Sequence, residues 1–291
     1  MSTVQPLHVE LLGSTTRLVR GKRFVTRVIE AGTGEPLILI HGVGNSAESF
    51  ARNVVRLGQN FHVYAIDALY HGFSTKTDYD AEQRVPLQAE AVLDLMDAEG
   101  LPAAHFEGES MGAGIAFELA MRHPDRTGKI ILNSGSYYVR FERSFPATGD
   151  GGVQLLMQLC RESVTDPSAA SQRARLEYFM AQPQRVTDEL VHLYCKLYAD
   201  PEINASMQRV FGITAPRGNL AAWSEAEAGG LTRPALVLWS DRNRGQSPAM
   251  GEYLASLLPG GQYYLVRDAG HWPQWEHAEE HDEVITTFLK S

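Results

Sequence analysis

The chain has two cysteines among its 291 residues, Cys160 and Cys195, and no long apolar run. Both cysteines fall in helical, partly apolar segments, where a buried thiol is more frequent than a disulfide. No segment reaches the about 18 consecutive apolar residues of a membrane-spanning helix. The first residues lack the basic stretch and apolar core of a secretion signal. The sequence therefore predicts a cytoplasmic protein that has no membrane partner.

A cluster of lysine and arginine is also missing. The 35 acidic residues outnumber the 26 basic ones, which gives a formal net charge of -9. This balance disfavours nucleic acids and anionic membranes as partners. Hydrophobic residues make up 44% of the chain and charged residues 21%, enough apolar surface for one large core. We therefore expect a globular enzyme whose partner is a small-molecule substrate.

Short apolar runs predict a parallel sheet. Continuous apolar runs are typical of strands that are buried on both faces. They lie at residues 36–40, 61–66, 130–132 and 235–239, with helical patterns between them. The alternating segments 16–20 and 24–30 predict an antiparallel edge. Because strands and helices alternate, we predict an α/β fold with a doubly wound, mostly parallel sheet.

The middle of the chain has helical sequence patterns. Strand-like runs are absent between about residues 135 and 228, where four helical patterns follow one another at 153–164, 169–180, 187–198 and 203–211. The glycine-rich stretch 149–152 predicts a turn that leads into this region. We predict a helical cap at residues 135–228, inserted into a core that consists of residues 1–134 and 229–291.

A G-x-S-x-G motif stands between a predicted strand and a predicted helix. It reads Gly108-Glu109-Ser110-Met111-Gly112. In that context the motif predicts a nucleophile elbow, a strained turn that presents the serine hydroxyl. The helix that follows points the positive end of its dipole at the place where an oxyanion would form. Ser110 is therefore the candidate nucleophile.

A serine nucleophile needs a base that accepts its proton. His271 follows the strand pattern at 262–266 and precedes the last helical pattern at 280–289, so we expect it at the carboxyl edge of the sheet with Ser110. His41 and His71 lie in glycine-containing turns and are expected to order the backbone. His277 and His281 are expected at solvated helix positions. His271 is therefore the candidate base.

Two backbone N–H groups are expected to hold the oxyanion. One is the N–H of Met111, directly after the nucleophile, and the other is the N–H of Val43 in the turn after a central strand. That glycine-rich turn lacks the lysine of a phosphate-binding loop and the spacing of a dinucleotide site. We expect neither a cofactor nor a metal.

Together these features resemble the α/β-hydrolase family, from about residue 37 to residue 289. The strings GHWPQWEH at 270–277 and VTDELV at 186–191 are similar to the meta-cleavage product hydrolases. Members of that subgroup cut a carbon–carbon bond in 2-hydroxy-6-oxo-hexadienoates during aromatic degradation. The resemblance implies a substrate site that includes Gly42, Asn53 and Trp272, and a homodimer as a possible assembly.

The third member of the triad is open between two residues. Hydrolases of this fold often read W-G-x-x-D after the corresponding strand, and matching from Trp239 puts the acid at Asn243. Asn243 can accept a hydrogen bond from His271, but it carries no charge to stabilise an imidazolium. Asp241 is the alternative acid.

Two more positions depart from the subgroup. Glu109 stands where an asparagine is common, and Tyr194 stands where the resemblance implies a cap arginine that binds the dienoate carboxylate. Losing the guanidinium disfavours an anionic substrate, and so does gaining the carboxyl group of Glu109 if that group is ionised. Either the substrate is neutral or its carboxylate binds elsewhere, with Lys196 and Arg140 as substitutes.

The predicted function is that of a serine-dependent hydrolase of a small, aromatic-derived keto or ester substrate. In the carbon–carbon reaction that the resemblance implies, the His271 and Ser110 pair protonates an enol before the carbonyl is attacked. A carboxylesterase or lactonase is the nearest alternative. A lyase, isomerase or cofactor-free oxygenase on the same fold is a further one, because a neutral residue at 243 suffices for a proton shuttle.

Overall fold

An eight-stranded sheet forms the centre of the molecule, in the order β1-β2-β4-β3-β5-β6-β9-β10. The computed structural model describes residues 5–146, 152–215 and 223–291. The strands of the sheet are β1 (Thr15–Arg20), β2 (Val25–Ala31), β3 (Pro36–Ile40), β4 (His62–Ile66), β5 (Ala104–Glu109), β6 (Thr127–Asn133), β9 (Ala235–Ser240) and β10 (Gln262–Val266). β2 is antiparallel to both of its neighbours, and every pair from β4 to β10 is parallel. The predicted doubly wound fold with an antiparallel edge is confirmed.

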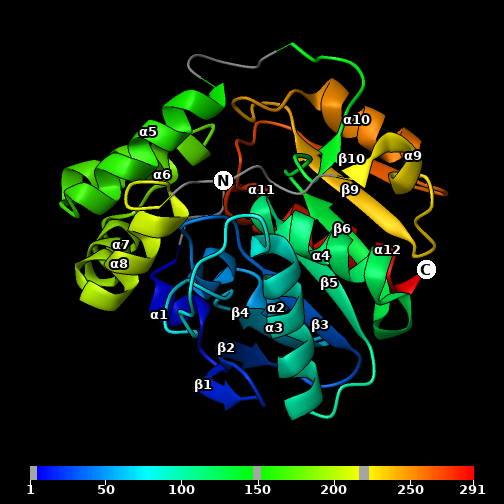
Figure 1. Ribbon diagram of the computed structural model, residues 1–291, viewed down its shortest axis with the longest axis horizontal. Helices are drawn as coiled ribbons and strands as arrows, with labels where there is room; N and C mark the ends of the chain where they lie inside the picture. Colours follow the sequence, from blue (N-terminus) through cyan, green and yellow to red (C-terminus); the bar gives the residue numbers. More distant parts are fainter. Residues whose placement is uncertain (1–4, 147–151, 216–222) are drawn as a thin grey trace.

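Helices cover both faces of this sheet. One face packs against α3 (Arg84–Ala98), α4 (Met111–Arg122) and α10 (Pro248–Leu257), and Figure 1 shows α3 and α4 in front of the strands. The other face packs against α2 (Val54–Leu57) and α12 (Ala278–Lys290). In β3, Ile38 and Ile40 join the first core, whereas Leu37 and Leu39 join the second. Burial on both sides explains why this strand is apolar without alternation.

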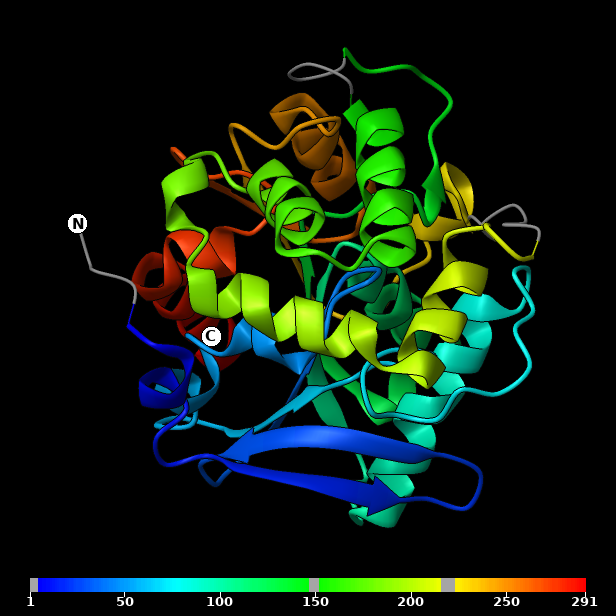
Figure 2. The same ribbon diagram turned by 90° about the vertical axis from the view of Figure 1, so that its left-hand side faces the viewer.

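Four helices gather at one end of the sheet (Figures 1 and 2). They are α5 (Gly152–Thr165), α6 (Ala169–Phe179), α7 (Asp188–Ala199) and α8 (Pro201–Val210). They share an apolar core with Trp272 and Trp275 from the segment after β10. Their side chains reach loops that follow strands: the Tyr198 hydroxyl donates to the carbonyl of Gly44 after β3 (2.7 Å). This group of helices therefore lies over the carboxyl edge of the sheet, and we refer to it as the cap.

Capping residues set where the cap helices begin. Ser168, Thr187 and Asp200 each accept an N–H of the first turn of α6, α7 and α8. α8 begins at Pro201, two residues before the prediction, because Asp200 caps it and proline suits the first helical position.

Short elements complete the chain. They are α1 (Leu7–Glu10), α9 (Glu225–Ala228) and α11 (Pro273–Glu276), the 3-10 turns η1 (Ala47–Phe50), η2 (Pro124–Arg126) and η3 (Pro183–Arg185), and a parallel pair of β7 (Val139–Arg140) and β8 (Trp223–Ser224). Tyr138 and Ala228 join the core under α4, so both ends of the predicted insertion are attached to the sheet. The domain boundaries stay a prediction, and of the predicted turn at 149–152 only residue 152 lies in the described part.

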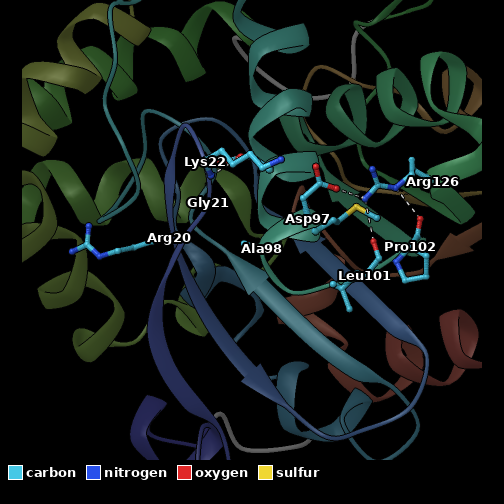
Figure 3. Close-up of a pocket in the computed structure, with 11 residues that line it drawn as sticks. Arg20, Gly21, Lys22, Asp97, Ala98, Leu101, Pro102 and Arg126 are labelled. Carbon is cyan, nitrogen blue, oxygen red and sulfur yellow. Dashed lines mark hydrogen bonds and ion pairs between the residues drawn. The ribbon is translucent and has the colours of Figure 1, made fainter.

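A surface pocket of about 570 Å³ lies away from the cap (Figure 3). It is lined by the turn between β1 and β2, the end of α3 and the loop that leads into β5. Arg126 in this pocket donates to Asp97 (2.8 Å) and to the carbonyl of Pro102 (2.8 Å), so its charge is already paired. Pro102 precedes β5, whereas Ser110 follows it.

Across the described ranges, no helix is long and apolar enough to span a membrane. Neither Cys160 nor Cys195 is in a disulfide.

Candidate active site

Ser110 stands at a sharp turn between β5 and α4. Its φ of 55° and ψ of -114° lie outside the regions that non-glycine residues favour. A Cβ added at Gly108 would come within 2.0 Å of the carbonyl oxygen of Gly112, and one at Gly112 within 2.0 Å of that of Ile40. Both glycines are therefore required for this close approach, and the local geometry is that of the predicted nucleophile elbow.

The structure brings His271 to Ser110. His271 lies on the loop between β10 and α11, and its Nε2 is 2.9 Å from Ser110 Oγ. The cap holds this histidine, because its backbone N–H donates to the Phe179 carbonyl (2.6 Å) and the Phe179 ring stacks on the imidazole. Burial lowers the pKa of His271 to about 4. The imidazole is thus neutral at neutral pH and can accept the Ser110 proton.

Asn243 occupies the position next to the other ring nitrogen of His271. Its Oδ1 is 3.0 Å from His271 Nδ1. When this oxygen accepts the Nδ1–H, Nε2 keeps the lone pair that a base needs. Asp241, the alternative acid, instead accepts the N–H of Ala269 (3.4 Å). The structure therefore brings Asn243 to His271 and leaves Asp241 outside the site.

The two predicted oxyanion donors are available. Val43 follows Gly42 in the turn after β3, and Met111 opens α4. Within the described residues, neither the Val43 N–H nor the Met111 N–H donates to another protein group. A Cβ added at Gly42 would come within 2.9 Å of Ser110 Cβ, so this turn packs directly on the nucleophile. This arrangement suits an anion that forms at a carbonyl attacked by Ser110.

Glu109 lies inside the site and is fully buried. Its Oε2 accepts the N–H of Gly42 (2.7 Å), and its Oε1 lies 3.2 Å from His271 Nε2. Burial raises the pKa of Glu109 to about 8, helped by the nearby carboxylate of Glu107. Glu109 is therefore a neutral carboxylic acid at neutral pH.

Aromatic rings form the wall of the site on the cap side. The Trp272 and Phe179 rings are stacked, with centroids 5.1 Å apart and planes 10° from parallel. Trp272 is fully buried, so its ring is not exposed to solvent. Tyr137 was not among the predicted site residues, and its hydroxyl lies 2.5 Å from Ser110 Oγ. No motif in the sequence marks Tyr137, since it follows β6 without a recognisable pattern.

A buried arginine was missed by the sequence analysis. Arg175 of α6 is 0% exposed, and its Nη1 donates to the Gly44 carbonyl (3.1 Å) and to Asn45 Oδ1 (3.2 Å). Its Nε and Nη2 make no hydrogen bond, and Arg175 forms no ion pair with a carboxylate in the described parts of the chain. Its guanidinium carbon is 4.6 Å from the centre of the ring of Tyr194, which is also buried. The spacing of Arg175 and Phe179, one helical turn apart, is the signal that points Arg175 toward the site.

Other predicted cations lie elsewhere. Lys196 and Arg140 are exposed, so neither substitutes for a buried carboxylate-binding residue. Asn53, predicted to bind substrate, instead donates from Nδ2 to Asp282 Oδ1 (2.8 Å) and to the carbonyl of Gln274 (3.1 Å). Its position under α12 indicates a structural role.

The expectation that His281 is solvated is wrong. His281 is fully buried, with Nε2 2.7 Å from Glu107 Oε1 and Nδ1 3.0 Å from Asp282 Oδ1. Burial by itself would lower the pKa of His281, but the two carboxylates raise it to about 10. The imidazolium therefore pairs with Glu107, two residues before Glu109 on β5. The helical pattern of α12 gave no sign that its polar face meets a buried glutamate.

Comparisons with known proteins identify the family of this chain. Residues 35–278 match the family model described as the alpha/beta hydrolase fold. The chain is 31% identical to a 2-hydroxy-6-oxo-6-phenylhexa-2,4-dienoate hydrolase of Burkholderia cepacia, over 89% of each chain. It is 30% identical to a 2-hydroxy-6-oxononadienedioate/2-hydroxy-6-oxononatrienedioate hydrolase of Comamonas testosteroni, again over 89% of each.

Solved structures share the fold. The chain superposes on the 2-hydroxy-6-oxo-6-phenylhexa-2,4-dienoate hydrolase of Rhodococcus sp. strain RHA1 with a TM-score of 0.81, covering 96% of this chain and 100% of that one at 22% identity. A meta-cleavage product hydrolase from Pseudomonas fluorescens IP01 gives a TM-score of 0.80, covering 96% and 98% at 23% identity.

Proposed function

The chain belongs to the α/β-hydrolase family, and we propose that it hydrolyses a carbon–carbon bond beside a ketone in a small, aromatic-derived 2-hydroxy-6-oxo-dienoate. The observation that carries this proposal is the 2.9 Å contact between Ser110 Oγ and His271 Nε2 at a nucleophile elbow. The similarity to relatives that bear the names of dienoate hydrolases supports the substrate class.

The first half of the reaction changes the substrate from an enol to a ketone. The neutral His271 Nε2 takes the proton of the 2-hydroxyl group, and the same proton is returned to the far carbon of the conjugated system. The chain of double bonds is thereby broken next to the 6-oxo group. An imidazole suits this exchange, because it accepts and donates a proton at the same atom.

The second half breaks the carbon–carbon bond. Ser110 Oγ attacks the 6-oxo carbon while its proton passes to His271 Nε2, and the carbonyl electron pair moves to the oxygen. The N–H groups of Val43 and Met111 stabilise that oxyanion. When the oxyanion collapses, the carbon–carbon bond breaks and the leaving carbon takes the proton from His271. Water, activated by His271, then hydrolyses the acyl ester on Ser110.

Arg175 supports an anionic substrate. A buried guanidinium without a carboxylate partner is costly, and a substrate carboxylate would satisfy its Nε and Nη2 with charge-assisted hydrogen bonds. This cation favours the alternative in which the substrate carboxylate binds away from position 194. The stacked Phe179 and Trp272 rings then suit the conjugated or aromatic part of the molecule.

The experiment is to mix the enzyme with a coloured dienol-ketone and to identify the products. Loss of the chromophore with formation of two acids supports the proposal, and Ser110→Ala should abolish formation of the acids. Loss of colour without cleavage would favour an isomerase. Turnover of p-nitrophenyl esters or lactones, with no effect on the dienol-ketone, would favour the esterase or lactonase alternative.

The cellular location and the assembly predicted from the sequence are also proposals. We propose a cytoplasmic enzyme that forms a homodimer, as the resemblance implies. Analytical ultracentrifugation of the purified protein tests the dimer, and a mass equal to one chain at micromolar concentration would contradict it.

A further inference from the structure

We propose that Glu109 acts as a neutral carboxylic acid that donates a hydrogen bond from Oε1 to an oxygen of the bound substrate. It would be a third donor at the reacting centre, in addition to the N–H groups of Val43 and Met111. The inference rests on the proposed function in one respect: the keto or enol oxygen of that substrate accepts the hydrogen bond.

The backbone fixes the orientation of this carboxyl group. Glu109 is the last residue of β5, directly before Ser110, and its side chain is 0% exposed. Its Oε2 accepts the N–H of Gly42 at 2.7 Å, in the turn that also carries Val43. An N–H donor binds the unprotonated oxygen of a carboxylic acid, so the acid proton belongs on Oε1. A Cβ at Gly42 would come within 2.4 Å of Oε2, so glycine is required for this contact.

The protonated oxygen faces the reacting groups. Oε1 lies 3.2 Å from His271 Nε2, the atom that contacts Ser110 Oγ at 2.9 Å. Within the described residues, Oε1 is buried and has no hydrogen-bond partner of good geometry. A buried donor without a partner costs free energy. A substrate oxygen that enters beside Ser110 and His271 would relieve this cost.

The surroundings keep the carboxyl group neutral. The titratable groups that face Glu109 are His271 on the loop after β10 and Glu107 on β5. Glu107 is paired with His281 of α12, and His281 also contacts Asp282. Burial raises the pKa of Glu109 to about 8; the N–H of Gly42 acts against this rise, and the Glu107 carboxylate adds to it. A charged carboxylate here would repel a developing oxyanion, whereas the neutral acid stabilises it. Other enzymes likewise keep a buried carboxylic acid protonated as an oxyanion donor.

Two variants separate this role from others. Glu109→Gln keeps a neutral donor that does not titrate, and Glu109→Met keeps the size and removes the donor. At pH 7 we expect kcat/KM of Glu109→Gln within about tenfold of wild type, and that of Glu109→Met lower by about 100-fold. The wild-type rate should fall above about pH 8 as Glu109 ionises, and this fall should be absent from Glu109→Gln. The exposed Glu35→Gln serves as the matched control and should keep the wild-type profile.

Each contrary result overturns the proposal. Equal losses in the two variants would mean that no donor is used at position 109. A loss above about 100-fold in Glu109→Gln at pH 7 would mean that the ionised carboxylate is needed. An alkaline fall that persists in Glu109→Gln would belong to another group. Unfolding curves of both variants check that they fold. If Glu109→Met does not fold, the pH profile of Glu109→Gln alone tests the proposal.

A second readout is independent of the carbon–carbon reaction. In protein labelled with ¹³C at the glutamate carboxyl carbon, the signal that is missing from Glu109→Gln should titrate near pH 8. The kinetic series is repeated with p-nitrophenyl acetate, which needs Ser110 and the oxyanion donors but no carbon–carbon cleavage. If the dienol-ketone is not cleaved while these results hold, the proposed function fails and the role of Glu109 stands. A signal that titrates near pH 4 would overturn the role of Glu109 itself.

Discussion

The guanidinium carbon of Arg175 lies 4.6 Å from the centre of the Tyr194 ring. The resemblance implies an arginine at position 194 on α7, and here a neighbouring helix, α6, brings a cation to the same region. Arg175 therefore places a positive charge beside position 194, although the residue at that position is a tyrosine.

Replacing Arg175 with methionine should weaken the binding of an anionic substrate. We expect KM for the dienoate to rise by about 100-fold, because a charge-assisted hydrogen-bonded pair is lost. Turnover of neutral p-nitrophenyl acetate should change by less than about threefold, since that ester has no carboxylate. Lys196→Met is the control on an exposed cation. An equal rise in KM for both substrates would contradict an anion site at Arg175.

Replacing Asn243 with aspartate should accelerate ester hydrolysis. A carboxylate 3.0 Å from His271 Nδ1 would stabilise the imidazolium that forms as Ser110 attacks. We expect kcat for p-nitrophenyl acetate to rise by about tenfold or more. For comparison, replacing the triad aspartate of a serine protease with asparagine lowers kcat by up to about 10⁴-fold. Steady-state kinetics of the purified variant measure this change.

Asp241→Ala is the control for that experiment. Its carboxylate contacts the backbone of Ala269 and does not reach His271, so we expect a change of less than about threefold, as for a residue outside the reacting pair. A loss as large as that of His271→Ala would show that Asp241 moves into the site during turnover.

The pKa of Glu109 makes stability depend on pH. The folded protein holds this proton up to about pH 8, whereas the unfolded chain releases it near the ordinary value of 4.5. The folded state therefore binds more protons between these values, and the free energy of unfolding falls as pH rises from about 4.5 to about 8. The side chain of Glu109→Gln does not titrate, so this fall in the free energy of unfolding is absent from the variant. Urea unfolding at pH 5 and pH 8.5 should show the variant gaining several kcal/mol relative to wild type, and a constant difference would contradict it.

His281→Leu should destabilise the protein. Removing the imidazolium leaves the carboxylates of Glu107 and Asp282 buried without their shared partner. Breaking one side of a buried ion pair typically costs about 3–5 kcal/mol. His192→Leu, on the exposed face of α7, is the matched control. Chemical denaturation measures both variants, and a loss below about 1 kcal/mol for His281→Leu would rule out a charged network.

The parts of the site that could be predicted from the sequence lie at the ends of strands. Ser110, His271 and Asn243 follow β5, β10 and β9, and parallel strands bring such residues to one edge of the sheet. Arg175 comes from the cap, where packing between helices decides which polar side chain faces inward. Local patterns do not contain that information.

Errors in the prediction have two different causes. The start of α8 was misplaced although the cues, Asp200 and Pro201, were present in the sequence. The burial of His281 had no local cue, because a polar residue on an amphipathic helix is normally solvated. Its partner Glu107 is 174 positions away, and only the tertiary fold pairs the two.

The bond between His281 and Glu107 connects α12 to β5, the strand that ends directly before Ser110. Docking of α12 therefore supplies the counter-ion of a carboxylate that stands on the strand leading into the nucleophile turn. A substitution that loosens α12 leaves Glu107 buried without this partner, three residues before Ser110.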